Sequence, residues 1–370
     1  ILIWDLPTRI FHWLFVLSFS AAWVVSENDR FLYEHVFFGY VFFGLIIFRF
    51  IWGWVGSHYA LFHSFAYDWP SVSAYLKGLL SGKAERHIGH NPAGGWAIFA
   101  MLTLAILIAT TGFLVFGGEE GHGPLASMIS YNVGHAAKEV HEFLANTMIL
   151  LVFLHIGGVI VESLIHKENL VWAMLSGFKP IDDNAKTIHI YALTGVILLF
   201  ATLGSGIYYF HGYITQTDAK PFLPFSLPPL PDNPTWETEC GDCHLAFHPT
   251  LLPKRSWIKI MQQQDNHFEE DLGYDKETTQ SILNFLVANA SESGETEAAH
   301  EMMNHIPANE TPLRITHTRF WKMKHRDIDK KYWESDEVNS KTNCPACHLD
   351  AKTGRFEDSD MRLPTLKKEK

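Results

Sequence analysis

Two copies of one five-residue motif contain every cysteine of this 370-residue chain. The motif, Cys-x-x-Cys-His, runs from Cys240 to His244 and again from Cys344 to His348. It is typical of covalent haem attachment, in which the thiols add to the porphyrin vinyl groups and the histidine binds the iron from one face. We therefore predict two haem c groups. The predicted attachment residues are Cys240, Cys243, Cys344 and Cys347, and the axial ligands are His244 and His348.

A zinc site built from the two Cys-x-x-Cys pairs is the alternative that this spacing leaves open. A four-cysteine zinc site has no use for a histidine directly after both second cysteines, so the pattern favours haem. No cysteine remains for a disulfide. Covalent haem attachment takes place outside the cytoplasmic membrane, so we expect the C-terminal part of the chain in the periplasm.

The sequence before the first motif differs sharply from the sequence around it. Residues 1 to about 214 are rich in Phe, Leu, Ile and Trp, whereas Lys, Glu, Asp and Asn are frequent from about residue 235 onward. The net charge of −11 gives no reason to expect nucleic acid binding. Apolar stretches of nearly membrane-spanning length predict five transmembrane helices. These stretches are Ile10–Ser26, Val36–Val55, Gly95–Phe116, Phe143–Ile165 and Ile188–Phe210.

Basic residues near these stretches predict the orientation. They gather on one set of flanks, whereas the opposite loops carry only Arg30 and Lys138 among several acidic residues. The basic set is Arg9, Lys77, Lys83, Arg86, Lys167, Lys179 and Lys186. Because basic loops stay in the cytoplasm, we expect a cytoplasmic N-terminus in a bacterial inner membrane. Five crossings then place the C-terminal part in the periplasm, where haem c is attached.

Four histidines lie within the predicted spans, where an ionisable residue is a functional candidate. His141 and His155 are fourteen residues apart, which returns them to one helix face with a rise of roughly 21 Å. Depth pairs His12 with His155 toward the cytoplasm and His35 with His141 toward the periplasm. A single such histidine would be explained better as a hydrogen-bonded core residue. Four at two depths predict two non-covalent haem b groups in a four-helix bundle.

The segment Trp4–Trp13 resembles the opening of the bacterial cytochrome b561 / nickel–iron hydrogenase b-type cytochrome family. The resemblance extends over residues 1 to about 180, through Phe48–Gly53, His90–Gly95, His141-Glu142 and Lys167–Leu170. It implies a four-helix core that holds two bis-histidine b haems and exchanges electrons with membrane quinone. It also implies ligand roles for His12, His35, His141 and His155, and a haem propionate near Arg49. An arginine that snorkels to the cytoplasmic surface would explain Arg49 equally well.

A proline-rich segment, residues 215–234, predicts a stiff linker to the outer domain. In that domain each motif supplies one axial ligand, so the sixth ligands come from elsewhere. We expect amphipathic helices over Ser256–Phe268, ending at His267, and over Phe320–Ile328, presenting His325. The candidate sixth ligands are His248, His267, His300, His305, His317, His325, Met261, Met302, Met303 and Met323.

Residues 235–370 resemble the dihaem cytochrome c family. The segments that carry the resemblance are Cys240–His244, Leu251–Pro253, Ser256-Trp257, His267-Phe268, Pro312–Thr316, His325 and Asn343–His348. The resemblance implies bis-histidine haems with His267 and His325 as distal ligands. Proximity in sequence pairs His267 with the first haem and His325 with the second. His248 departs from the small residue or proline usual at its position and competes as a ligand.

The sequence thus predicts an all-α protein: a transmembrane four-helix haem bundle (1–180), a fifth transmembrane helix (181–214), the linker (215–234) and a small, mostly helical periplasmic dihaem domain (235–370). We expect an electron carrier with two haem b and two haem c groups that links the quinone pool to a periplasmic redox protein, with quinol oxidation as the one candidate for catalysis. The alternatives are a haem-bearing membrane anchor of a larger oxidoreductase and a haem-based redox or gas sensor. Bis-histidine irons have no open position for substrate, so we assign no catalytic residue.

Overall fold

The computed structural model describes residues 1–180, 186, 188–215 and 229–365. Regular structure in this part of the chain is entirely helical, as predicted, and β-pairing is limited to isolated bridges. The chain forms two compact units: unit 1 is Ile1–Leu114 with Ala136–Pro224, and unit 2 is Val115–His135 with Phe225–Lys370. Most of the predicted linker, residues 216–228, lies outside the described residues.

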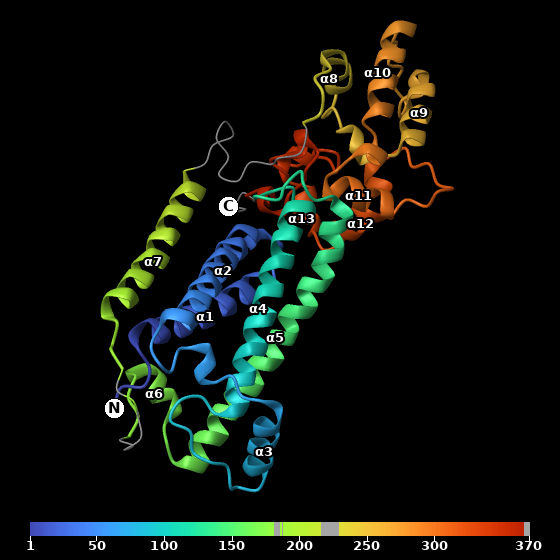
Figure 1. The fold of residues 1–370 in the computed structure, drawn as a ribbon. Coiled ribbons are helices and arrows are strands. Elements are labelled where there is room, and N and C mark those ends of the chain that lie inside the picture. The colour runs from blue at the N-terminus through green and yellow to red at the C-terminus, as the bar shows by residue number, and fades with distance from the viewer. Residues whose placement is uncertain (181–185, 187, 216–228, 366–370) are drawn as a thin grey trace. The chain divides into compact units, whose positions relative to one another are not determined.

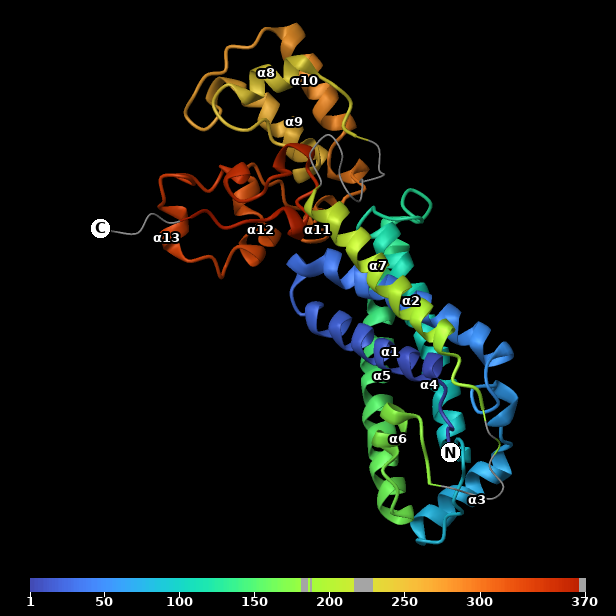
Figure 2. The same cartoon turned by 90° about the vertical axis from the view of Figure 1, so that its left-hand side faces the viewer.

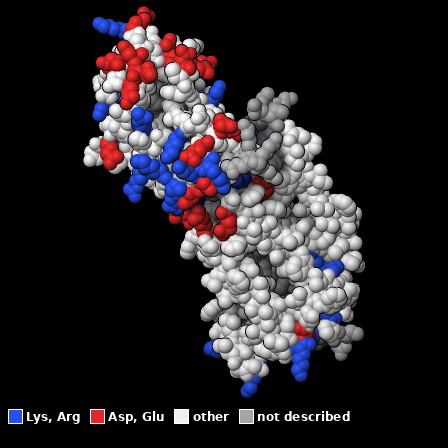
Figure 3. All heavy atoms as spheres, turned by 180° about the vertical axis from the view of Figure 1, so that it is seen from behind, with Lys and Arg blue, Asp and Glu red and all other residues white. Residues whose placement is uncertain are grey.

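Unit 1 contains the apolar helices, which Figures 1 and 2 show as long rods. Five of them are long and apolar enough to cross a membrane, which confirms the predicted number of spans. They are α1 (Leu6–Val25), α2 (Leu32–Val55), α4 (Pro92–Gly118), α5 (Tyr131–His166) and α7 (Ala192–Ile214). The shorter helices are α3 (Trp69–Leu80) and α6 (Leu170–Ser176). The flank of unit 1 seen in Figure 3 is almost free of charged side chains, as contact with lipid requires.

Local sequence explains where these helices begin and end. The Asp5 side chain accepts the Thr8 backbone N–H at 2.8 Å, and Pro7 occupies the first turn of α1. Helix α5 begins at Tyr131, twelve residues before the predicted apolar stretch. Its first three turns contain polar residues, so hydropathy alone missed them. The close approach of Gly134 to Gly118, where a Cβ would lie 2.7 Å from the Gly118 carbonyl carbon, packs this extension against the end of α4.

The spans of unit 1 pack around a shared apolar core. Helix α1 lies against α2 and α7, and Figures 1 and 2 show α4 running beside α5. Phe42 and Ile46 of α2 meet Ala105 and Ile108 of α4 and Met148 of α5, all buried. This arrangement brings α1, α2, α4 and α5 into one bundle, which is the setting in which helical proteins hold cofactors.

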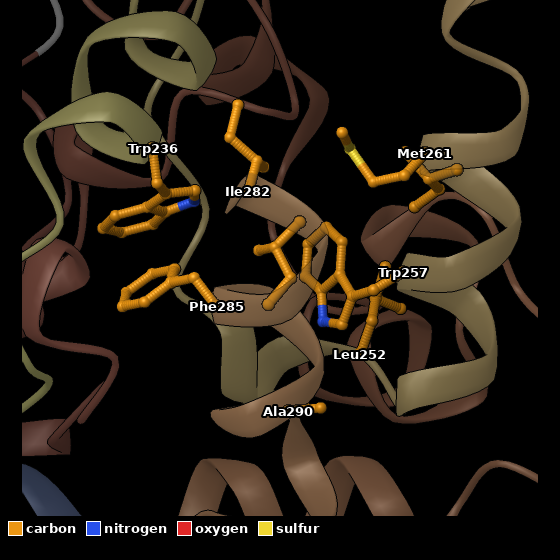
Figure 4. Packing of buried hydrophobic residues seen from close by; sticks show 9 residues of the cluster. Trp236, Leu252, Trp257, Met261, Ile282, Phe285 and Ala290 are labelled. Carbon is orange, nitrogen blue, oxygen red and sulfur yellow. The ribbon is translucent and has the colours of Figure 1, made fainter. Parts of the chain in front are cut away.

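Unit 2 builds its core from short helices after the linker. The helices are α8 (Pro234–Gly241), α9 (Lys254–Gln262), α10 (Lys276–Ala288), α11 (Glu297–Asn304), α12 (Arg319–Lys324) and α13 (Lys330–Trp333). Figure 4 shows Trp236 of α8 beside Phe285 of α10, with Trp257 of α9 on the other side of the cluster. Helix α9 ends at Gln262, before the predicted His267, because the chain continues through a 3-10 turn at Gln264–Asn266.

We expect Ile282→Ala to lower the free energy of unfolding of unit 2 by about 3 kcal/mol, because the side chain is fully buried and the substitution leaves a cavity. Chemical unfolding of the haem-loaded protein, followed by tryptophan fluorescence, measures this change. The matched control is Ile258→Ala, since Ile258 of α9 is 37% exposed and its loss is expected to cost no more than about 0.5 kcal/mol. Equal losses in the two variants would contradict the assignment of this core.

Candidate haem sites

The first Cys-x-x-Cys-His motif lies at the end of α8, and its histidine faces a second histidine. The ring centroids of His244 and His267 are 6.4 Å apart, with an angle of 30° between the ring planes. The Nδ1–H of His244 donates to the Leu245 carbonyl at 2.7 Å, which leaves Nε2 as the free lone pair. A metal bound to both rings through bonds of about 2 Å would place the centroids about 6 Å apart. The spacing therefore fits one six-coordinate iron.

The second motif has the same arrangement. The centroids of His325 and His348 lie 6.1 Å apart. The Nδ1–H of His325 donates to the Trp321 carbonyl at 2.8 Å, and Trp321 also stacks on the His325 ring. Helix α12 ends at Lys324, so His325 caps it rather than lying inside the predicted longer helix. Two histidine pairs at iron-spanning distance, each with a Cys-x-x-Cys pair directly before one member, are what two haem c groups require.

The pKa values of these imidazoles suit metal binding. Burial, followed by the charge of His325, lowers the pKa of His348 to about 4. Burial also lowers the pKa of His267, and the neighbouring His244 and Arg314 lower it further. Since only a neutral imidazole binds iron, both residues are held in the ligating form at neutral pH.

The four cysteines do not come together as a zinc site would require. All four are free thiols, and no group of three or more His, Cys, Asp or Glu side chains in the described part of the chain has the arrangement of a metal site. Each Cys-x-x-Cys pair instead stays beside its own histidine pair. The geometry thus separates two sites, as two porphyrins would need.

The apolar unit contains a third histidine pair. His35 of α2 and His141 of α5 have ring centroids 6.1 Å apart, with 76° between their planes. The Nδ1–H of His35 donates to the Ala22 carbonyl at 2.9 Å, and that of His141 donates to the Ile108 carbonyl at 3.0 Å. Both rings therefore keep Nε2 available, and the hydrogen bonds fix their orientation as in other metal sites.

His12 of α1 and His155 of α5 form the remaining pair. They lie close enough to interact electrostatically, and Nδ1 of His12 is buried without a hydrogen-bond partner. A buried orphaned nitrogen is costly unless a ligand uses the ring. The sequence prediction paired these residues by depth, and in the structure each lies within electrostatic range of the other.

Glycines leave open space along the two helices α2 and α5, which carry three of these histidines. An added Cβ on Gly39 or Gly44 of α2, or on Gly157 or Gly158 of α5, would meet no atom within 4 Å. At Gly112 of α4 it would approach Cε1 of His141 to 3.2 Å, so that position keeps the ring in place. The donor set and the open space together fit haem groups held between α2 and α5 and between α1 and α5.

Comparisons with known proteins agree with this geometry. Residues 3–177 match the family model of prokaryotic cytochrome b561, and residues 236–356 match that of dihaem cytochrome c. The chain joins a cytochrome b561 region to a dihaem cytochrome c region. It is therefore a membrane electron-transfer protein with b-type and c-type haem.

Some relatives are similar to the cytochrome b561 region and others to the dihaem cytochrome c region. Probable Ni/Fe-hydrogenase B-type cytochrome subunits from Azotobacter chroococcum and Escherichia coli are each 23% identical, over 49% and 48% of this chain and 89% of their own length. The solved dihaem cytochromes c of Rhodobacter sphaeroides and Shewanella baltica are 35% and 27% identical. They cover 35% and 37% of this chain, and 100% and 96% of their own, with TM-scores of 0.31 and 0.30.

In the dihaem cytochrome c region four of the other candidate sixth ligands have contacts away from the motif histidines. Met261 and Met302 are buried in the apolar core. His300 stacks on Tyr131 at 3.9 Å, and His305 donates through Nδ1 to the Glu301 carbonyl. Only His267 and His325 have a ring contact with a motif histidine among the candidates of this region that the structure describes.

His248, the competing candidate, is 5% exposed, and its Nδ1 lies 2.7 Å from the Thr250 hydroxyl. Burial lowers its pKa to about 4. An unfolded histidine titrates near pH 6.5, so between pH 6.5 and pH 4 the unfolded state is protonated at His248 whereas the folded state is not. The free energy of unfolding is therefore unaffected by this residue above about pH 6.5 and decreases as the pH falls toward 4. We expect His248→Gln to remove about 2–3 kcal/mol of the acid destabilisation of the dihaem region. Unfolding curves of variant and wild type from pH 7 to pH 4 measure this; parallel curves would contradict it.

In the cytochrome b561 region, Arg49 of α2 is 5% exposed and does not reach a surface. Its guanidinium lies over the rings of Phe62 and Phe65, with Cζ 4.6 and 5.8 Å from their centroids, and its Nη1 has no hydrogen-bond partner. This excludes a snorkelling side chain. A buried guanidinium with an orphaned nitrogen fits an anionic partner such as a haem propionate.

A cavity of about 290 Å³ lies before the start of α4. Its lining includes His58, Tyr67, Arg86, His87 and His90. The ring of His90 is enclosed by Trp4 and Phe65, at centroid distances of 4.7 and 4.5 Å, and its Nδ1 has no partner. Burial, with a smaller contribution from the charges of Arg49 and Lys179, lowers the pKa of His90 to about 3. The ring is therefore neutral.

The sequence analysis missed an acidic residue near this cavity. Glu162 lies within span α5, is 8% exposed, and accepts a hydrogen bond from the Tyr75 hydroxyl. The prediction rested on the histidines of the apolar stretches and did not include this carboxylate. The same rule, that an ionisable residue within a span has a function, would have found it.

Proposed function

We propose that this protein transfers electrons between membrane quinone and a redox partner in the periplasm, through two haem b and two haem c groups. The observation that carries the proposal is the set of histidine pairs, three of which have ring centroids 6.1 to 6.4 Å apart. The haems, when bound, supply one-electron chemistry. The chain supplies both axial ligands of each iron, which leaves no coordination site for substrate.

Specific residues take each role in this proposal. His12 with His155 and His35 with His141 hold the b haems, and Arg49 binds a propionate. Cys240, Cys243, His244 and His267 hold the first c haem, and Cys344, Cys347, His348 and His325 hold the second. The cavity beside His90 offers a quinone head group a buried nitrogen for hydrogen bonding.

The proposed setting is a bacterial inner membrane. Basic residues around α3, among them Lys77, Lys83 and Arg86, favour a cytoplasmic location for that end of unit 1. The five spans then carry the dihaem region to the periplasmic side, where covalent attachment takes place.

Quinol addition to the haem-loaded protein in liposomes tests this function. We expect the absorption bands of reduced haem b to appear first and those of reduced haem c to follow. In the reverse experiment, we expect oxidised quinone to reoxidise both kinds of haem after their reduction with dithionite. The proposal would be overturned if quinol did not reduce the haems and quinone did not oxidise them.

A second candidate function follows from the hydrogenase-associated relatives. In this alternative the chain is the membrane anchor and electron conduit of a larger oxidoreductase. Purification after mild solubilisation distinguishes the two: a partner subunit present in equal amount supports the anchor, whereas a protein isolated alone with full quinol reactivity supports the first proposal.

A further inference from the structure

The cavity beside His90 is connected to a buried group of titratable side chains that electron transfer alone does not explain. Glu162 of α5 and Tyr75 of α3 are 8% and 6% exposed, and the Tyr75 hydroxyl donates to Oε2 of Glu162. Burying a carboxylate costs free energy unless it is paired, so its retention here calls for a partner or a role.

The second carboxylate oxygen of Glu162 lies near a side chain that is partly exposed to solvent. Its Oε1 lies 3.5 Å from Nε2 of His166, one turn farther along α5. The His166 side chain is 13% exposed and the Glu162 side chain 10%, so the imidazole has some access to water. The contacts from Tyr75 through Glu162 to His166 thus lead from a buried hydroxyl to a partly exposed imidazole.

Tyr75 contacts a residue that lines the cavity. Its ring meets the edge of His87 at a centroid distance of 5.4 Å, and His87 lines the cavity together with Tyr67 and His90. His87 also contacts Tyr67 in the same edge-on manner, at 6.0 Å. The Nδ1–H of His87 donates to the Glu85 carbonyl at 3.0 Å, which leaves Nε2 free, and water between this ring and the Tyr75 hydroxyl would complete the path from the cavity.

One buried cation lies near enough to Glu162 for the two charges to interact. Lys179 is buried and lies 3.9 Å from Oε2 of Glu168, which also pairs with Arg86. Burial lowers the pKa of Lys179 and raises that of Tyr75, and the hydrogen bond to Glu162 raises the latter further. Tyr75 therefore stays protonated and can pass a proton only while it receives another.

We propose that His87, Tyr75, Glu162 and His166 form a proton relay between the quinone cavity and the aqueous phase at the α3 end of unit 1. This inference rests on the proposed quinone function. Oxidation of one quinol releases two electrons to the haems and two protons to the cavity. For each proton, Tyr75 gives its hydroxyl proton to Glu162 and takes one from the cavity, and Glu162 passes the proton to His166 and water. Quinone reduction uses the same groups in reverse.

The test compares Glu162→Gln and Tyr75→Phe with wild type in the haem-loaded full chain. Both substitutions keep the side-chain volume but interrupt proton transfer. Stopped-flow measurement of haem b reduction by a ubiquinol analogue is expected to slow by about tenfold or more in each variant. The affinity for the oxidised quinone and the haem absorption spectra are expected to remain unchanged. Small proton carriers such as formate or imidazole in the buffer are expected to restore the rate of Glu162→Gln, because they accept the protons that the missing carboxylate would have accepted.

The matched control is Glu85→Gln, which removes an exposed carboxylate from the loop before the cavity. We expect wild-type rates from it. Wild-type rates in Glu162→Gln and Tyr75→Phe would overturn the relay, and so would slow rates explained by a matching loss of quinone affinity. If wild-type protein itself does not react with quinol, the proposed function fails and the relay fails with it. If wild type reacts with quinol and both variants react at the same rate, the relay alone fails.

Discussion

Replacing His35 or His141 by alanine is expected to remove one b haem and to leave the other three haems in place. The two rings face each other at 6.1 Å, so either substitution takes away one of the two ligands of the same iron. In a pyridine haemochrome assay the b signal should fall by about half, with the c signal unchanged. The double variant should lose no more than either single variant, because both act on one site.

His12→Ala and His155→Ala are expected to remove the other b haem. A combined His141→Ala/His155→Ala variant should therefore lose the whole b signal. The control is His211→Ala, because His211 lies on span α7 outside both pairs and its loss should leave both b haems. Loss of the same haem in the His141 and His155 single variants, detected by its redox potential, would refute the pairing.

Replacing His267 by alanine is expected to open the first c haem to carbon monoxide. In wild type both faces of the iron are occupied by His244 and His267, so the gas should not change the spectrum of the reduced protein. In the variant the iron becomes five-coordinate and should bind carbon monoxide at one of the two c haems. Absorption spectra of the reduced protein with and without the gas measure the change.

His248→Gln is the matched control for this experiment. His248 is also buried in the same region, but it contacts Thr250 rather than a motif histidine. Its substitution should leave the reduced spectrum unaffected by carbon monoxide. A response in His248→Gln but not in His267→Ala would reverse the ligand assignment. A response in wild type would instead support a gas sensor.

Some features of the helices were easier to predict than others. Hydropathy located all five spans because lipid contact demands long uninterrupted apolar segments. It did not locate the start of α5, whose first turns are polar and are held by the contact between Gly118 and Gly134. The predicted helix to His267 was too long. The chain leaves α9 at Gln262 and turns through Gln264–Asn266, where the Gln264 side chain accepts a hydrogen bond from the Thr279 hydroxyl of α10.

The sequence by itself determined the cofactor chemistry, because Cys-x-x-Cys-His motifs and histidines within apolar spans are local patterns whose meaning does not depend on the rest of the fold. It also determined the two families and the number of spans. Only the tertiary structure decided that Arg49 is buried against Phe62 and Phe65, and that Tyr75 reaches Glu162 across eighty-seven residues of sequence. Contacts of this kind depend on how separate helices pack, and packing is set by the combined shape of many side chains rather than by any one segment.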